Sequence, residues 1–552
     1  MSRSPLRWAA AVGLTAILLV AEFSLFQDFF EPFLLLWHQG RIFACVLSLL
    51  LFLWSLLGAF LLLFSGRSLV RTLSLPVFVF FLLFNVGYYT AANAPFDLQQ
   101  SVTIVRNFQW FFREAVENFG LALLPVLLVL VPLILIAEWL PSFFRLDLSR
   151  WLYAVPLGAV VLIMLGVQHS DAVFDRYPSF FRVPSLFLFA GLSREYDGER
   201  QAVSYTGPIR PQVDKIVLIV DESIRADILG INGYPQATTP YLRTLDSGIV
   251  NFGLAAAASN CSDYSNLILR SGARKQAIPD REQITLKAPT IWQYMKQAGF
   301  RTVYIDAQSP DGATGFQNFM NRQEARFIDE MIRSRQEVAH QSDRAALVSL
   351  QAHLERPGRT FVMLNKYGLH FPYFRSYPHE REPFTPALGP GEPMADRERS
   401  LNSFMNGVRW SVDDWFRALL SQRDAFEPYA IIYTSDHGQN IVDDGTLGTH
   451  CRPRATRFEG IVPMIVLSSD AAILGRFAAV REASTDRTSH FQIFPTLLGL
   501  AGYPESWVAS RYGASLGVRP DSPPQFFVGD LHARGSVRRW ISIRPGGTGG
   551  SR

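Results

Sequence analysis

The sequence predicts a chain of two parts: an α-helical membrane domain, followed by an α/β domain built on a central, mostly parallel sheet. Apolar residues are concentrated in the first third of the 552 residues, in runs long enough to cross a bilayer. From Val213 onward, short β-rich runs alternate with helical patterns. Such alternation is typical of a parallel sheet covered by helices on both faces. We therefore predict a membrane domain over residues 1–168 and an α/β domain over 213–545.

Five apolar runs in the first part predict five membrane-spanning helices. One such run could be a buried helix of a soluble protein, but five in succession favour a membrane domain. A cleaved signal peptide would account only for the first run. An odd number of spans places the two ends of the chain on opposite sides of the membrane. The runs are Trp8–Phe26, Ile42–Phe64, Leu73–Ala92, Gly120–Leu140 and Trp151–Gln168.

The charges of the short connections predict the orientation, because positively charged loops near span ends remain in the cytoplasm. Arginines precede the first span and occupy every second connection, whereas the other connections carry no positive excess. The amino terminus is therefore predicted to be cytoplasmic, and the chain after residue 168 to lie outside. The arginines are Arg3, Arg7, Arg67, Arg71, Arg145 and Arg150. A net charge of +4, spread evenly, does not favour binding to nucleic acid.

Three further segments have their own character. Asp97–Phe119, between the third and fourth spans, combines aromatic residues with arginines, which favours an amphipathic interfacial stretch over an ordinary polar loop. Residues 169–212 mix aromatics, prolines and charges without a sustained period, and predict a linker lying on the membrane or on the outer domain. The glycine- and arginine-rich end, 546–552, predicts a disordered tail.

Polar residues with ligand chemistry follow several predicted strands of the second part. In parallel sheets, ligands bind beyond the carboxyl ends of the strands. Asp221 and Glu222 follow the first run, His370 the third, and Asp436 and His437 the fourth. The five runs are Asp214–Val220, Arg301–Asp306, Arg359–Asn365, Tyr429–Thr434 and Val462–Leu467.

Asp436 and His437 are good zinc ligands, but such a pair could also cap a helix or lie in a solvated turn. Glu222, from another strand end, would complete the three protein ligands of a catalytic zinc site and leave a fourth position open. A nucleophile is expected on a loop or helix start in the same place. The stretch Asn260–Ser265 is the candidate, although a serine-rich turn is also a common helix cap.

The motifs, in order, resemble those of the lipid A phosphoethanolamine transferases of the alkaline phosphatase and sulfatase superfamily. Glu222–Asp227 and Asn232–Pro240 resemble the opening of that family's catalytic domain, and Leu364–Tyr373 its Leu-His-x-x-Gly-x-His-Gly-Pro-x-Tyr element. Tyr433–Gly438 resembles its metal-binding strand end. The later matches are Gly448–His450, Val462–Pro463, Thr488–His490 and Pro495–Leu498.

The resemblance implies five spans in a bacterial inner membrane and a periplasmic catalytic domain of sulfatase-like fold. It implies zinc, with Mn²⁺ or another divalent metal as the alternative, bound by Glu222, Asp436, His437 and the nucleophile. The family's Thr-Ala-x-Ser element places Ser262 at the nucleophile position. The Thr-Ser-Asp element of the lipoteichoic acid synthases would place Cys261 there instead.

The resemblance also gives roles to three histidines. His370 and His450 match family histidines near the transferred phosphate, where they could stabilise charge, protonate the leaving group or hold a second metal. His490 is expected to contact substrate, to support the ligands or to serve the fold. Asp221 is expected beside the ligands and not among them.

The sequence departs from the family at Asn365, which stands where the family has histidine, and in lacking its multiple disulfides. Cys261 and Cys451 are the only cysteines of the second part, so at most one bridge is possible there, and a bridge would exclude Cys261 as nucleophile. Cys45 is expected to pack in the second span. The stretch after Cys261 lacks the x-Pro-Ser-x-Arg element of the formylglycine sulfatases.

The resemblance implies zinc-dependent transfer of phosphoethanolamine from a membrane phospholipid to a hydroxyl of lipid A or another envelope glycan, through a phosphoserine intermediate. A phosphoglycerol transferase or a hydrolase would keep the same site. A domain without activity that serves envelope assembly is a third possibility. We expect a monomer.

Overall fold

The computed structural model describes residues 29–63, 68–92, 95–106, 108, 152, 154–167, 172–193, 195–309, 320–390, 392, 394–447, 449–532 and 539–544. The chain forms two compact units, which divide between Arg194 and Glu195.

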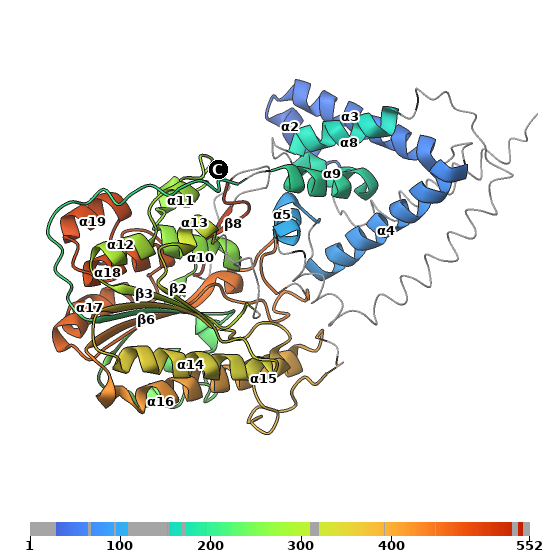
Figure 1. The fold of residues 1–552 in the computed structure, drawn as a ribbon. Helices are drawn as coiled ribbons and strands as arrows, with labels where there is room; N and C mark the ends of the chain where they lie inside the picture. The colour runs from blue at the N-terminus through green and yellow to red at the C-terminus, as the bar shows by residue number, and fades with distance from the viewer. Residues whose placement is uncertain are drawn as a thin grey trace, which may run out of the picture. The chain divides into compact units, whose positions relative to one another are not determined.

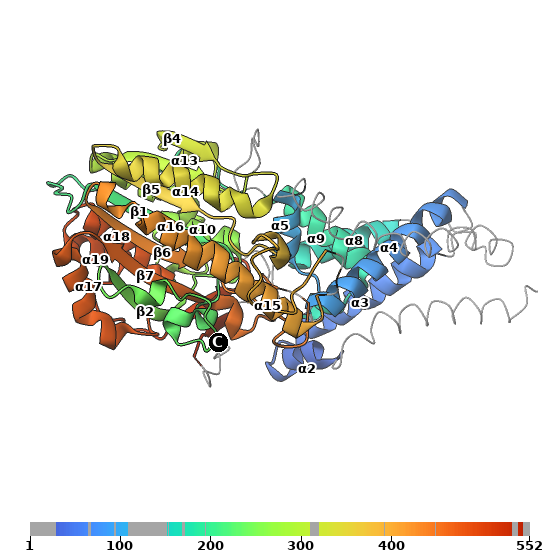
Figure 2. The same cartoon turned by 90° about the horizontal axis from the view of Figure 1, so that it is seen from below.

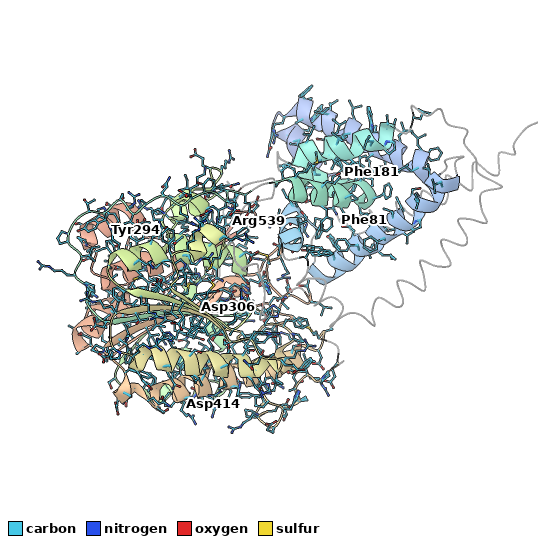
Figure 3. The ribbon with its side chains drawn as sticks, viewed as in Figure 1. Phe81, Phe181, Tyr294, Asp306, Asp414 and Arg539 are labelled. Carbon is cyan, nitrogen blue, oxygen red and sulfur yellow. A yellow bond between two sulfur atoms is a disulfide. The ribbon has the colours of Figure 1, made fainter. Side chains whose placement is uncertain are left out.

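The first unit is helical. Its apolar side chains share one core, to which Phe78, Phe96 and Phe181 contribute. Figure 3 labels Phe181 on α9 and Phe81 on α4. The helices are α2 (Glu31–His38), α3 (Ile42–Leu63), α4 (Ser68–Ala92), α5 (Leu98–Arg106), α8 (Ala154–Val167) and α9 (Ser179–Leu192), with a 3-10 turn at Ala172–Arg176.

Helix α3 coincides with the second predicted span, and within the described residues its segment Ile42–Leu62 alone is long and apolar enough to cross a membrane. The third and fifth predicted spans coincide with α4 and α8, whose apolar stretches are shorter. The first and fourth predicted spans, Trp8–Phe26 and Gly120–Leu140, lie outside the described residues. The five-span arrangement therefore stays a prediction.

Two connecting segments differ from a simple loop or linker. Helix α9 lies within the predicted linker 169–212. Its helical pattern of apolar residues is interrupted in the sequence by Pro184 and by Arg182. Arg182 is nevertheless buried, and its Nη2 donates to Asn85 Oδ1 at 2.6 Å. Helix α5 begins the predicted interfacial stretch, and residues 109–119 of that stretch lie outside the described residues, as does the predicted tail 546–552.

The second unit is built on a seven-stranded sheet in the order β2-β7-β6-β1-β5-β3-β4. All five predicted strands are present, with ends within one residue of the prediction. The sheet is mixed, because β7 runs antiparallel to β6 and β2, while the other neighbours are parallel. The strands are β1 (Lys215–Asp221), β2 (Ile249–Ala256), β3 (Arg301–Asp306), β4 (Glu330–Arg333), β5 (Thr360–Asn365), β6 (Tyr429–Ser435) and β7 (Ile461–Ser468), and a separate ribbon pairs β8 (Gln525–Val528) with β9 (Arg539–Ser542).

Helices cover both faces of this sheet, as Figure 1 shows and as Figure 2 shows from the side of α14, α15 and α16. Ile216 and Leu218 of β1 pack on one layer, and Val217 and Ile219 on the other. In Figure 3, Asp306 at the end of β3 lies between the layers that carry Tyr294 and Asp414.

The helices of one layer are α10 (Ser262–Ser271), α12 (Ile291–Gln297), α17 (Ala471–Ser484), α18 (Ile493–Leu500) and α19 (Glu505–Tyr512); those of the other are α14 (Ala339–Glu355), α15 (Arg397–Val408), a π-helical turn (Arg409–Asp414) and α16 (Trp415–Leu420). Two short helices, α11 (Ile284–Lys287) and α13 (Arg322–Ala325), complete the unit.

The neighbouring strands β6, β1, β5, β3 and β4 all run in the same direction, so their carboxyl ends share one edge of the sheet. The loops that leave these ends therefore meet, and they carry most of the residues that the sequence singled out.

Candidate metal centre

Glu222, Asp436 and His437 lie at the carboxyl ends of β1 and β6. The two strands are paired, with Asp221 opposite Ser435, so the residues that follow them leave the sheet side by side. All three side chains are buried. The sheet therefore brings together the three ligands that the sequence predicts.

Four potential donor atoms converge on one point. His437 Nε2 lies 3.0 Å from Ser262 Oγ, 3.4 Å from Glu222 Oε1 and 3.4 Å from Asp436 Oδ2. Zinc bonds to nitrogen and oxygen are about 2.0–2.2 Å long, so the edges of a tetrahedral site measure about 3.4 Å. One nitrogen and three oxygens at this spacing suit zinc, and the arrangement could hold one ion of that size.

Neighbouring groups orient these atoms toward each other. His437 Nδ1 lies 2.7 Å from the Gly438 carbonyl, which fixes the tautomer whose Nε2 carries the free lone pair. Asp436 Oδ1 accepts hydrogen bonds from the backbone N–H groups of His437 and Ser223, at 2.7 and 3.1 Å. Its other oxygen, Oδ2, is buried and accepts no hydrogen bond from any described residue. A buried carboxylate oxygen without a hydrogen-bond donor lacks a partner, and a metal ion would supply one.

The electrostatics also favour a cation. Burial raises the pKa of Asp436 to about 7, and the nearby Glu222 carboxylate adds to this rise. Two buried carboxylates disfavour each other's charge unless a positive charge lies between them. A divalent ion would supply it.

Ser262 begins α10, and Cys261 occupies the N-cap position. The side chains of Ser262 and Asp263 remain partly exposed, whereas the helix is buried from Tyr264 onward. Cys261 forms a disulfide with Cys451, next to His450. A bridged cysteine has no thiol to attack with, so the structure excludes Cys261 as a nucleophile. The bridge also joins the loop of Ser262 to the loop of His450.

His450 lies against the ligands. Its ring stacks on that of His437 with 4.2 Å between the centroids, and one ligand atom each of Glu222, His437 and His450 lies within 4.8 Å of the other two. Its Nδ1 contacts Gln439 Oε1 at 3.1 Å. Burial lowers the pKa of His450 well below its ordinary value, with His437 and His370 adding to the decrease, so this ring is neutral at pH 7.

His370 lies on the loop after β5. Its Nδ1 contacts the Phe371 carbonyl at 2.9 Å, and its ring lies 6.0 Å from that of Tyr367. The N–H of Leu369, the preceding residue, bonds to the Glu222 carbonyl at 3.0 Å, so this loop lies beside the centre.

His490 is predicted to contact substrate, to support the ligands or to serve the fold, and its contacts in the structure are with the fold. Its Nδ1 accepts from the N–H of Ala258, and its Nε2 lies 3.1 Å from Thr434 Oγ1. Burial lowers its pKa to about 3. A buried ring with both nitrogens engaged ties the chain after β2 to the end of β6.

Several supporting residues were not predicted. Gln308, after β3, donates to Glu222 Oε2 at 3.1 Å. Lys366 is fully buried and its Nζ lies 2.6 Å from Asp221 Oδ2, while Asp221 Oδ1 accepts from the N–H of Glu222 at 3.0 Å. Burial raises the pKa of Asp221 to about 6, against the opposing effect of Lys366.

Asp221 therefore lies directly behind Glu222, and its role beside the predicted ligands stays a prediction. Little in the sequence indicated that Gln308 and Lys366 support the centre. Gln308 and Lys366 follow strand ends, but neither residue type is a usual metal ligand.

Gly368 allows the loop after β5 to approach this centre. Its φ of +54° is left-handed, and a Cβ at this position would lie 2.4 Å from Asp221 Oδ1 and 2.7 Å from Glu222 N. Only glycine fits here without displacing the strand end that carries Glu222.

The disulfide gives a first prediction. Replacing both Cys261 and Cys451 with alanine is expected to lower the free energy of unfolding by about 2–5 kcal/mol, because the bridge closes a long loop. It is also expected to weaken zinc binding, because the loops of Ser262 and His450 lose their link. Thermal unfolding and zinc titration of the full chain in detergent would measure both.

Cys45→Ala is the matched control, since Cys45 is buried in the first unit without a bridge. Unchanged stability and zinc affinity in the double variant would show that the bridge does not hold these loops.

Residues 214–503, slightly more than half of the chain, match the model of the sulfatase family. The Kdo(2)-lipid A phosphoethanolamine 7''-transferase of Escherichia coli strain K12 is 26% identical over 314 residues, which cover 54% of this chain and 54% of that protein. The phosphoethanolamine transferase EptC of the same strain is 26% identical over 265 residues, covering 46% of this chain and 45% of that protein. The chain thus matches about half the length of these curated relatives.

Two solved structures share the fold. The integral membrane lipooligosaccharide phosphoethanolamine transferase A (EptA) from Neisseria meningitidis has a TM-score of 0.59 at 19% identity, covering 89% of this chain and 95% of that one. The zinc complex of the C-terminal periplasmic domain of EcEptC from Escherichia coli has a TM-score of 0.51 at 19% identity, covering 61% of this chain and 97% of that domain.

Proposed function

Because the chain belongs to the sulfatase family, we propose that it transfers phosphoethanolamine from a membrane phospholipid to a hydroxyl group of lipid A or another envelope glycan. The observation that carries this proposal is the place of Ser262, whose Oγ lies 3.0 Å from His437 Nε2, in the cluster completed by Glu222 and Asp436. A hydroxyl bound to a metal ion would be activated as a nucleophile.

The relatives support the reaction. The curated relatives are phosphoethanolamine transferases, and one of them acts on Kdo(2)-lipid A. Zinc is supported by the donor set of this chain and by the zinc complex of the EcEptC domain. The apolar helix α3 supports attachment to a membrane, which we propose to be the bacterial inner membrane, with the catalytic unit in the periplasm and the amino terminus in the cytoplasm.

The proposed chemistry has two displacement steps. In the first, Ser262 Oγ bonds to the phosphorus of the donor, the bond from phosphorus to the diacylglycerol oxygen breaks, and that oxygen leaves with a proton. In the second, the oxygen of the acceptor hydroxyl bonds to the phosphorus of the phosphoserine, the bond from phosphorus to Ser262 Oγ breaks, and the proton lost by the acceptor returns to Ser262. A bound zinc ion would lower the pKa of the Ser262 hydroxyl and neutralise charge on the phosphoryl oxygens.

The chain's own residues would move the proton. His450 is neutral and partly buried within the cluster, so it offers a ring nitrogen through which the Ser262 proton would pass to the departing diacylglycerol oxygen without being held on the ring. His370, on the neighbouring loop, would donate from Nε2 to a phosphoryl oxygen in its protonated form, since its Nδ1 already faces the Phe371 carbonyl. The N-terminal end of α10, where Ser262 lies, directs backbone N–H groups toward the same anion.

The full chain in lipid nanodiscs, given phosphatidylethanolamine labelled in its headgroup, tests the proposal. We expect label to appear in a lipid A or envelope glycan fraction, and diacylglycerol to form in equal amount. Label found only in free phosphoethanolamine would instead indicate a hydrolase. Transfer from phosphatidylglycerol but not from phosphatidylethanolamine would indicate a phosphoglycerol transferase. No reaction with either lipid, in the presence of zinc, would contradict the proposal.

A further inference from the structure

Three arginines surround two aromatic rings beside the loop that carries His370. The Arg335 guanidinium lies 4.3 Å from the centroid of the Tyr367 ring. The guanidinium groups of Arg344 and Arg381 lie 4.4 and 5.8 Å from the centroid of the Trp410 ring. We refer to these five residues as the arginine–aromatic cluster.

The cluster borders the metal centre. Arg335 follows β4, where the N–H of Ser334 bonds to the Asp306 carbonyl at 2.9 Å, so it leaves the same sheet edge as the ligands. The ring of Tyr367, on which Arg335 lies, is 6.0 Å from the ring of His370.

One buried carboxylate joins the two halves of the cluster. Asp343 Oδ1 accepts from the N–H of Tyr367 at 2.7 Å, and Asp343 Oδ2 accepts from Ser411 Oγ at 2.9 Å. Arg344 directly follows Asp343, and Trp410 directly precedes Ser411 in the π-helical turn. Turns of this kind are rare and occur frequently at functional sites.

Several buried arginines of the fold are paired with carboxylates. Arg225 lies 2.6 Å from Asp443, and Arg270 lies 2.6 Å from Glu324. By contrast, Arg335 and Arg344, which are partly exposed, and Arg381, which is exposed, form neither an ion pair nor a side-chain hydrogen bond with any residue that the structure describes.

Nη1 of Arg335 is buried and has no acceptor among those residues. A buried guanidinium N–H without an acceptor is unfavourable, and the planar fork of arginine matches a phosphate or carboxylate.

We propose that the arginine–aromatic cluster binds an anionic group of the acceptor, so that the acceptor is an acidic glycan. The inference rests on the proposed function. Three guanidinium groups would attract the phosphate of the zwitterionic donor but repel its ammonium group, so an anionic group without a neighbouring cation suits the cluster better. An anion held by Arg335 would place a hydroxyl of the same sugar near His370, while the aromatic rings offer apolar faces to the sugar rings.

Kinetics of the full chain in nanodiscs, with an acidic glycan acceptor and phosphatidylethanolamine, tests the inference. Arg335→Gln and the double variant Arg344→Gln/Arg381→Gln are expected to raise KM for the acceptor about tenfold or more. The KM for the donor and the slow release of phosphoethanolamine to water should stay unchanged. Arg356→Gln is the matched control, because Arg356 follows the far end of α14 and is exposed.

Competition identifies the charge that is bound. A glucose phosphate and glucuronate are expected to inhibit transfer by the wild-type chain, and methyl glucoside is not; the stronger inhibitor of the two would distinguish phosphate from carboxylate. Both charged sugars should inhibit Arg335→Gln less than the wild type. Inhibition of Arg335→Lys, which keeps the positive charge but not the planar guanidinium, should be intermediate between the two.

An unchanged acceptor KM in Arg335→Gln would overturn the inference, whether or not the melting temperature falls. Inhibition by methyl glucoside equal to that by the charged sugars would overturn it as well. A wild-type chain that neither transfers nor releases phosphoethanolamine would instead contradict the proposed function.

Discussion

Replacing Ser262 with alanine is expected to reduce transfer of phosphoethanolamine by about 10⁴-fold or more, because removal of a nucleophile leaves only the binding contributions of the site. Ser262 is the partly exposed first residue of α10 and lies 3.0 Å from His437 Nε2. Transfer of headgroup label in nanodiscs measures the rate. Intact-protein mass spectrometry, with donor present and acceptor absent, should show one phosphoethanolamine group on the wild-type chain and none on the variant.

Two further variants separate chemistry from folding. Ser262→Thr keeps a hydroxyl and should retain measurable transfer. Ser271→Ala removes a hydroxyl at the other end of the same helix, where the side chain is buried away from the ligands, and should transfer at the wild-type rate. A modified residue other than Ser262 in the wild-type chain, or wild-type rates in Ser262→Ala, would contradict the assignment.

The strands of the second unit could be predicted closely because their residues are buried on both faces. β1 and β6 are continuous apolar runs, and a continuous run signals a buried strand. Strand β2 was not predicted, because Asn251 and Gly253 interrupt its pattern where its pairing with β7 shifts register. In the first unit, α9 was not predicted for a similar reason, since Arg182 is buried inside it.

The residues that cluster at the centre could be predicted from their place after strand ends, because parallel strands bring such residues together whatever their distance along the chain. Their roles as ligands stay predictions. The supporting groups could not be predicted. The supporting role of Lys366 follows only from its contact with Asp221 in the structure. Arg335 stands out only because its Nη1 has no acceptor among the described residues. His490 shows the converse, because its two hydrogen bonds to the fold leave no trace in the sequence.

Replacing Glu222 with glutamine is expected to weaken zinc binding about 100-fold or more, since losses of 10–100-fold follow even from changes to groups that only orient a ligand. Zinc content after purification, and the rise in melting temperature on adding zinc, measure the effect without any assay of transfer. The wild-type chain should gain about 2.7 kcal/mol of stability when zinc is present at 100 times its Kd. Asp214→Asn is the control, because this exposed acid precedes β1, at the opposite end from Glu222.

The same variant should have the opposite effect once zinc is removed by a chelator. In the metal-free chain, burial and the Glu222 carboxylate raise the pKa of Asp436 to about 7, so the ionised pair destabilises the folded state increasingly as the pH rises above the ordinary pKa of aspartate. Glu222→Gln removes one charge, so at pH 8 its metal-free form should be more stable than the metal-free wild type.

Denaturant unfolding with and without chelator measures the stability of the two chains: we expect the wild type to be the more stable with zinc, and Glu222→Gln the more stable without it. If Glu222→Gln is less stable than the wild type both with and without chelator, Glu222 stabilises the fold itself. The carboxylates would then not be explained by metal binding.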